Sequence, residues 1–132
     1  MVRFLLDTNV ISEPPKERPN AKLLRRLKAH EGQVAVASVS WHEIVHGIER
    51  MPTGRKKERL RAYFALVRAS LPILPYDERA AEWHAKERVR LRRTPPFVDG
   101  QIAAIAATNA LTLVTADADF KPFDVKLENW LS

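Results

Sequence analysis

The chain has 132 residues, of which 45% are apolar, contains no cysteine and carries a formal net charge of +6. Its length suits one domain, and the lack of cysteine excludes disulfides, zinc–thiolate sites and thiol nucleophiles. The apolar segment after Met1 ends at Asp7, and no stretch approaches the roughly 18 to 20 apolar residues that cross a bilayer. We therefore expect a cytoplasmic protein without a membrane span. The basic surplus favours polyanionic partners such as nucleic acids, although a basic solubility surface has the same composition.

Short apolar runs alternate with amphipathic segments along the chain. In chain order we expect a strand over 3–6 that ends in a loop over 7–9, a helix over 20–30, a strand over 34–37, helices over 38–51 and 55–71, an extended segment over 72–75, helices over 77–93 and 98–110, and strands over 111–115 and 125–127. This alternation predicts an α/β fold with a mainly parallel sheet covered on both faces. In such sheets, ligands bind beyond the carboxyl ends of the strands.

Four acidic residues are expected at that edge of the sheet. Asp7 follows the first strand and Asp117 follows the strand over 111–115, whereas Glu43 and Asp99 lie in the first turns of their helices. If each crossover is right-handed, both helix starts face the same edge as the two strand ends. Four carboxylates repel one another, and a hard divalent cation such as Mg²⁺ relieves this repulsion. Such a cation polarises a phosphodiester and activates water, so a basic protein with an acidic metal site fits a nuclease.

These acids also have structural interpretations. Ser40 and Glu43 have the spacing of a capping box, in which Glu43 reaches back to the Ser40 amide. Asp99 in a first helical turn interacts well with the helix dipole, and Asp117 is a good N-cap for the turn over 118–120. Asp119 is expected to be a turn or capping residue, and a secondary metal role is the less favoured alternative. The hypothesis of a metal site therefore rests on the four acids together.

Four segments carry a resemblance to a known family. They are LLDTNVIS at 5–12, ASVSWHEIVHGIERMP at 37–52, FVDGQIAAIAATNALTLVTADADF at 97–120 and FKPFDVKLENW at 120–130. In this order they resemble PIN domains, and more narrowly the VapC and FitB-like toxins of bacterial type II toxin–antitoxin pairs. The resemblance implies a single PIN domain over 1–132 with a Rossmann-like three-layer α/β/α fold. It further implies an RNA endonuclease dependent on Mg²⁺ or Mn²⁺, a homodimer, and inhibition by a cognate antitoxin in a toxin–antitoxin assembly.

The resemblance also assigns roles to the four acids. Asp7 matches the acid of the first strand and Asp99 the acid that opens the FVDGQIAA helix, and both are implied as direct metal ligands. Glu43 matches the acid of the helix before GIERMP, and Asp117 matches a fourth position where members carry Asn or Asp. Metal-activated water then hydrolyses the RNA phosphodiester. The alternative is a PIN-like module that binds RNA or an assembly partner without cleaving it, and the complete set of acids argues against this.

Polar and basic residues around the acids are candidates for supporting roles. By the resemblance, Asn9 and Thr115 orient carboxylates or water, although a threonine at a strand end is more often structural. One basic cluster lies over 55–61, and a second leads toward Asp99 and is the better RNA candidate, through Arg88, Arg90, Arg92 and Arg93. For any single residue of this second cluster, a solvated helix face is an equally good interpretation. Apolar side chains of the helices over 20–30 and 38–51 are expected to form a groove for a segment of the antitoxin.

Two other enzyme classes that use aspartate fit less well. A haloacid-dehalogenase-type phosphatase needs a second aspartate two residues after the first, where this chain has Asn9. A phosphoacceptor receiver domain needs a lysine after the late strand and an acid pair near the first strand. Neither feature is present here in that form.

Overall fold

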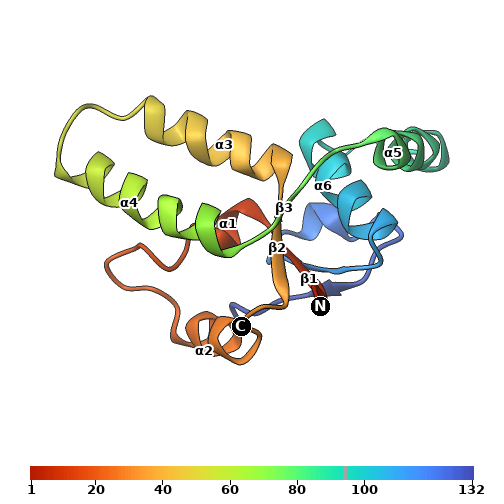
Figure 1. The fold of residues 1–132 in the computed structure, drawn as a ribbon. Coiled ribbons are helices and arrows are strands. Elements are labelled where there is room, and N and C mark those ends of the chain that lie inside the picture. The colour runs from red at the N-terminus through yellow and green to blue at the C-terminus, as the bar shows by residue number, and fades with distance from the viewer. Residues whose placement is uncertain (94) are drawn as a thin grey trace.

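Five parallel strands form the centre of the computed structural model, which describes residues 1–93 and 95–132 (Figure 1). The strands are β1 (Phe4–Leu6), β2 (Val34–Ala37), β3 (Ile73–Leu74), β4 (Thr112–Val114) and β5 (Leu127–Glu128). They lie in the order β3-β2-β1-β4-β5, and every neighbouring pair is parallel. The predicted α/β fold with a parallel sheet is therefore confirmed, and β1 and β4 are neighbours whose carboxyl ends meet.

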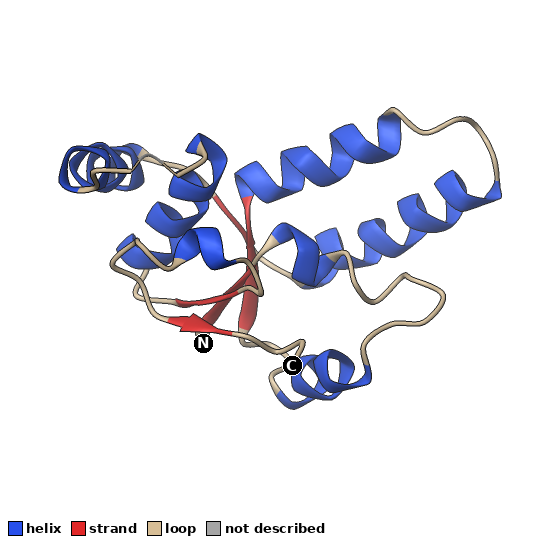
Figure 2. Ribbon diagram, turned by 180° about the vertical axis from the view of Figure 1, so that it is seen from behind, coloured by secondary structure: helices blue, strands red, loops and turns tan. Residues whose placement is uncertain are grey.

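Helices cover both faces of this sheet (Figures 1 and 2). They are α1 (Thr8–Ile11), α2 (Ala21–Ala29), α3 (Ser38–Glu49), α4 (Arg55–Ser70), α5 (Glu78–Arg90), α6 (Phe97–Thr108) and the 3-10 helix η1 (Ala118–Phe120). Helices α3 and α4 pack on one side and α5 and α6 on the other, which gives the three layers that were expected. None of the helices in the described part of the chain is long and apolar enough to span a membrane.

The sheet has a separate core on each face because side chains alternate across a strand. Phe4 and Leu6 of β1 enter the core shared with α1 to α4, whereas Leu5 enters the core shared with α5 and α6. The second core is rich in alanine from α6, and these small side chains let the helix lie close to the sheet. Close packing of α6 holds its first turn, which carries Asp99, at the edge where β1 and β4 end.

The structure differs from the sequence-based expectation in one short segment and confirms it in another. Residues 7–9 were expected to be a loop, but α1 begins at Thr8 because the Asp7 carboxylate caps it by accepting the Thr8 N–H. The segment expected to be extended over 72–75 supplies β3, an edge strand in which Ile73 pairs with Val36. Most other element ends differ from the expected ones by a few residues.

The predicted groove between the helices over 20–30 and 38–51 is wrong. Helix α4 lies between α2 and α3 in Figure 1, and it shares one groove with α3 and another with α2. Amphipathic patterns identified the apolar faces of these helices correctly. They did not reveal which helix packs beside which, because that depends on contacts between distant parts of the chain.

Candidate metal centre

Asp7 lies in the turn that joins β1 to α1, and its carboxylate is held on both sides. Its side chain is only 6% exposed. One carboxylate oxygen accepts the Thr8 N–H at 2.8 Å, and the other accepts the Thr115 hydroxyl at 2.9 Å. Burial raises the pKa of Asp7 against the effect of these hydrogen bonds, and repulsion from Asp117 and Glu43 raises it further. Among the described residues, no lysine or arginine forms an ion pair with Asp7.

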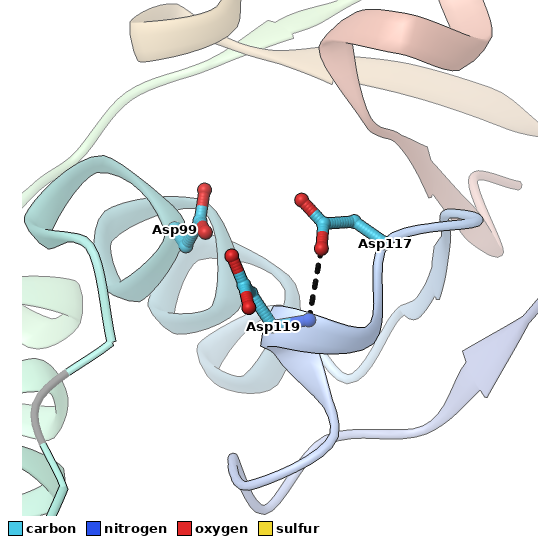
Figure 3. A group of neighbouring side chains, drawn as sticks. All are labelled: Asp99, Asp117 and Asp119. Atoms are coloured by element: carbon cyan, nitrogen blue, oxygen red, sulfur yellow. Dashed lines mark hydrogen bonds between the residues drawn. The ribbon is translucent and has the colours of Figure 1, made fainter.

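Three other aspartates lie together beside it. Figure 3 shows Asp99, from the first turn of α6, facing Asp117 and Asp119, which lie in the turn that follows β4. One carboxylate oxygen of each lies within 4.8 Å of the others. Asp117 also caps η1, because one of its oxygens accepts the Asp119 N–H at 2.9 Å. The capping interpretation of Asp117 is thus confirmed, and the residue also faces the cluster.

Asp119 is the member of this cluster that was not among the four acids predicted to hold the metal. It was expected to occupy a turn or cap, with a secondary metal role as the less favoured alternative, and a single residue separates it from Asp117. The 3-10 turn over Ala118–Phe120 directs both carboxylates toward Asp99. The available signal was the Asp-Ala-Asp spacing after a buried strand, which places two carboxylates in one tight turn.

The electrostatics of Asp99 show that all these acids share one edge of the sheet. Burial raises the pKa of Asp99 from its ordinary value of 3.8 to about 6, and four neighbouring carboxylates add to the effect. In decreasing order of effect they are Asp117, Asp7, Asp119 and Glu43. The four acids predicted to converge, Asp7, Glu43, Asp99 and Asp117, are therefore brought together, with Asp119 as a fifth.

Glu43 faces this edge and does not cap its own helix. The Thr8 hydroxyl donates to one Glu43 carboxylate oxygen at 2.9 Å. Helix α3 begins at Ser38 with Ala37 as its N-cap and has no side-chain cap. The capping-box interpretation of Ser40 and Glu43 is therefore wrong, because Ser40 lies within the first turn of the helix and not at its N-cap. Thr8 instead connects Glu43 to the turn that carries Asp7.

The Thr115 hydroxyl joins the two strand ends that carry acids. It donates to Asp7 at 2.9 Å and accepts the Asp117 N–H at 3.0 Å, and the residue is only 5% exposed. These contacts suit the orienting role predicted for Thr115, which stays a prediction. Asn9 is exposed in α1, and no side-chain hydrogen bond of Asn9 is found within residues 1–93 and 95–132. The orienting role predicted for Asn9 is therefore not supported by a side-chain contact among these residues.

Thr115→Val is expected to lower the free energy of unfolding by about 1–3 kcal/mol, because it leaves the Asp117 N–H and an Asp7 oxygen without a partner. Mn²⁺ affinity should fall by roughly 10-fold or more, as for other residues that orient metal ligands. Thr115→Ser keeps the hydroxyl and serves as the control. Urea denaturation and Mn²⁺ titration measure both effects. Equal stability and equal affinity of the two variants would contradict the bridging role.

The four arginines predicted to bind RNA differ in their surroundings. The Arg88 guanidinium lies 5.2 Å from the centre of the Phe97 ring, and Phe97 lies in the same first turn of α6 as Asp99. Arg90 is held by both Glu87 oxygens at 2.6 Å and by the Pro122 carbonyl at 3.0 Å, so it fastens α5 to the turn after η1. Exposed Arg92 and Arg93 follow the helix. RNA binding by these four residues stays a prediction, and Arg90 is the least available of them.

The donor set at this edge fits a hard divalent cation. The groups that gather are carboxylate oxygens, and the chain contains no cysteine. Oxygen-only sites of this kind suit Mg²⁺ or Mn²⁺, whereas zinc and copper sites use thiolate or imidazole ligands. Without a cation, the carboxylates repel one another, as the raised pKa of Asp99 indicates. A bound divalent cation relieves that repulsion.

Comparison with known proteins agrees with the observed fold. The PIN domain family model matches residues 4–126. Toxin FitB of Neisseria gonorrhoeae is 33% identical over 136 residues, covering 96% of this chain and 96% of that protein. Ribonuclease VapC2 of Haemophilus influenzae is 27% identical over 138 residues, covering 99% and 100%. The solved structure of FitAB bound to an IR36 DNA fragment has a TM-score of 0.85 at 31% identity, covering 98% of this chain and 96% of that chain.

Proposed function

Because this chain belongs to the PIN domain family, we propose that it is a metal-dependent RNA endonuclease and the toxin of a type II toxin–antitoxin pair, with residues 1–132 forming one PIN domain. The observation that carries the proposal is the gathering of Asp99, Asp117 and Asp119 within 4.8 Å of one another, beside Asp7 and Glu43. A relative that is 27% identical over nearly the whole chain is named a ribonuclease, which supports RNA as the substrate.

We assign the cation to Asp99 and its acidic neighbours. Asp7 and Asp99 are the ligands we expect to matter most, and Asp117, Asp119 and Glu43 complete the site. When bound, Mg²⁺ or Mn²⁺ supplies Lewis-acid activation of the phosphodiester and of the attacking water. The chain keeps the Asp7 carboxylate fixed through Thr8 and Thr115, so this ligand needs little reorganisation when the cation binds.

Glu43 is the carboxylate we assign to accept a proton from the attacking water. It is exposed, and its Thr8 contact holds one of its oxygens beside the turn that carries Asp7. A carboxylate within reach of the attacking water acts as a general base for its proton. Attack of water on phosphorus with departure of the 3′ oxygen leaves a 5′-phosphate on one product and a 3′-hydroxyl on the other.

Cleavage of end-labelled total RNA by the purified chain, free of any partner, tests this function. Discrete fragments with 5′-phosphate ends are expected in Mg²⁺ or Mn²⁺, and intact RNA is expected in EDTA. The alternative function is a PIN-like module that binds RNA without cutting it. A folded protein that binds the labelled RNA and leaves it intact with both metals would support that alternative.

A protein partner completes the proposal. The solved relative described above is FitAB bound to DNA. By analogy we propose that this chain dimerises and is held inactive by an antitoxin, in the cytoplasm where its RNA substrate is found. The groove between α2 and α4 has a volume of about 640 Å³ and exposes 39% of Leu24 and 69% of Leu66. An amphipathic helix of the antitoxin suits this apolar surface.

A further inference from the structure

A groove runs from the candidate metal centre between α1, α3 and α4. Its volume is about 910 Å³, and Thr8 and Glu43 form its end nearest the acids. Since Thr8 follows Asp7 in the chain, the groove and the acidic edge are continuous. The rest of its wall is largely apolar and includes Ile44, Ile48, Met51, Leu60 and Phe64. A flat apolar group can therefore lie against this wall with a polar group at the acids.

The rim of the groove is cationic. Arg55, Lys56 and Arg59 line it from the first turns of α4, and all three are exposed. Within the described part of the chain, none of the three forms an ion pair. Their neighbours on α4 are engaged elsewhere, because Lys57 donates to the Glu49 and Met51 carbonyls and Arg61 pairs with Glu49. Three uncompensated cations thus face the groove.

Gly47 keeps the groove open where α3 lines it. A glycine in a helix interior is less favourable than alanine by roughly 1 kcal/mol. Nothing in the described fold requires this glycine, since a Cβ placed on it meets no atom within 4 Å and its φ is not positive. The effect of the missing side chain is free space in the groove. This free space is independent of the cationic rim, and it is a second observation that points to a bound ligand in the groove.

We propose that this groove binds single-stranded RNA beside the bond that is cut. Because this rests on the proposed nuclease function, the strand runs from the acidic edge into the groove. Arg55, Lys56 and Arg59 bind its phosphates, and an unstacked base lies against the apolar wall. Four cations and two acids line the groove, so its charge favours a polyanion over a neutral or basic protein segment. A duplex does not fit this arrangement, because its bases are already stacked.

Filling the groove at Gly47 tests the base contact. Fluorescence anisotropy measures binding of a labelled mixed-sequence RNA of about 12 nucleotides in EDTA, which separates binding from cleavage. Gly47→Leu should weaken binding by roughly 10-fold or more, the loss expected for one stacked base. Gly47→Ala leaves most of the space open. The RNA affinity of this variant should therefore stay within about twofold of the affinity of the original protein. Both variants should fold, since each replaces glycine inside a helix with a better helix former.

Removing the rim charges tests the phosphate contacts. The triple alanine variant of Arg55, Lys56 and Arg59 should lower the slope of log affinity against log salt by about 2, for three lost phosphate contacts to a single strand. The matched control is the triple alanine variant of Lys22, Arg25 and Arg26, three exposed cations of α2 that do not line the groove. It removes the same charge and should change the slope by much less.

Two outcomes would overturn the proposal. One is unchanged RNA affinity in Gly47→Leu, which would leave the groove to a protein partner. The other is that the α4 and α2 triple variants lose the same amount of RNA affinity and show the same decrease in salt dependence. The effect would then come from net charge alone and not from the groove. A chain that binds RNA through the groove but does not cleave it in Mg²⁺ or Mn²⁺ would contradict the nuclease function alone.

Discussion

Asp99→Asn is expected to abolish RNA cleavage while stabilising the metal-free protein. Asparagine keeps the shape of the side chain but removes the charge that the other acids repel and that a cation requires. Loss of this ligand should lower cleavage by on the order of 1000-fold, which corresponds to about 4 kcal/mol of transition-state stabilisation. Cleavage of labelled RNA in Mg²⁺, measured beside the thermal melting of both proteins in EDTA, tests the two halves of the prediction.

The stability gain of Asp99→Asn should depend on pH. The pKa of Asp99 is about 6 in the folded protein, above its ordinary value of 3.8. The folded state therefore holds this proton more tightly than the unfolded state. Ionisation of Asp99 destabilises the folded state above pH 6, and this loss of stability disappears as the pH falls toward 4. After allowance for solvent screening, the gain is about 1 kcal/mol, or on the order of 3 °C at neutral pH. It should vanish in acid.

A charge removed elsewhere provides the control for this experiment. Glu31 is exposed in the turn between α2 and β2, and it is not among the carboxylates that raise the pKa of Asp99. Glu31→Gln should melt like the original protein at each pH and cleave RNA normally. An Asp99→Asn protein that melts at or below the original temperature at neutral pH would mean that the acids do not repel one another in the folded state.

Gly100→Ala is expected to be the most damaging addition of a single methyl group. Gly100 follows Asp99 in the first turn of α6, and a Cβ placed on it would lie 2.0 Å from the His84 Nε2 atom. His84 is only 2% exposed and cannot easily move away. The Tyr76 hydroxyl lies 2.9 Å from its Nδ1 atom, and the Phe97 ring lies 4.7 Å from its ring. The added methyl group must therefore displace α6 or the imidazole.

Gly100→Ala should lower the free energy of unfolding by about 1–3 kcal/mol, the usual effect of overpacking a core. Cleavage should fall as well, because displacement of the first turn of α6 moves Asp99 away from the other acids. Urea denaturation and the RNA cleavage assay measure these effects. Gly47→Ala makes the same chemical change in another helix interior, where the added Cβ meets nothing within 4 Å, and it should stabilise the protein.

His84→Ala provides the internal test of this packing contact. It removes the ring that the Gly100→Ala methyl group strikes, so the double variant should be more stable than the sum of the single effects predicts. The expected coupling is on the order of 1 kcal/mol. Additive effects of Gly100→Ala and His84→Ala would mean that the imidazole is not the obstacle. If Gly100→Ala stabilised the protein as Gly47→Ala is expected to do, the close contact at Gly100 would be contradicted.

Local sequence patterns predicted correctly which strand ends and which helix start carry the acids. Asp7 and Asp117 were identified because each follows a short apolar strand, and the parallel pairing of β1 with β4 brings those ends together. Asp99 was identified from its place in the first turn of an alanine-rich helix. The family and the α/β fold expected from the motifs are confirmed. These features depend on the order of residues within single segments.

Features that depend on contacts between segments could not be predicted in the same way. The partner of Glu43 is the Thr8 hydroxyl, 35 residues away in the chain, and nothing near Glu43 indicates it. Asp119 joins the cluster only because η1 turns its side chain toward α6. The close contact of Gly100 with His84 joins two helices. Helical periodicity alone indicates none of these contacts.

Titration of Mn²⁺ into the metal-free protein tests most directly the claim that these acids hold the catalytic cation. The electron paramagnetic resonance signal of free Mn²⁺ reports binding in the original protein and in Asp99→Asn, Asp119→Asn and Glu31→Gln. We predict saturable binding at neutral pH that is retained in Glu31→Gln, weakened in Asp119→Asn and lost in Asp99→Asn. Mn²⁺ binding that is absent from the original protein, or that is equal in the original protein and Asp99→Asn, would contradict the assignment.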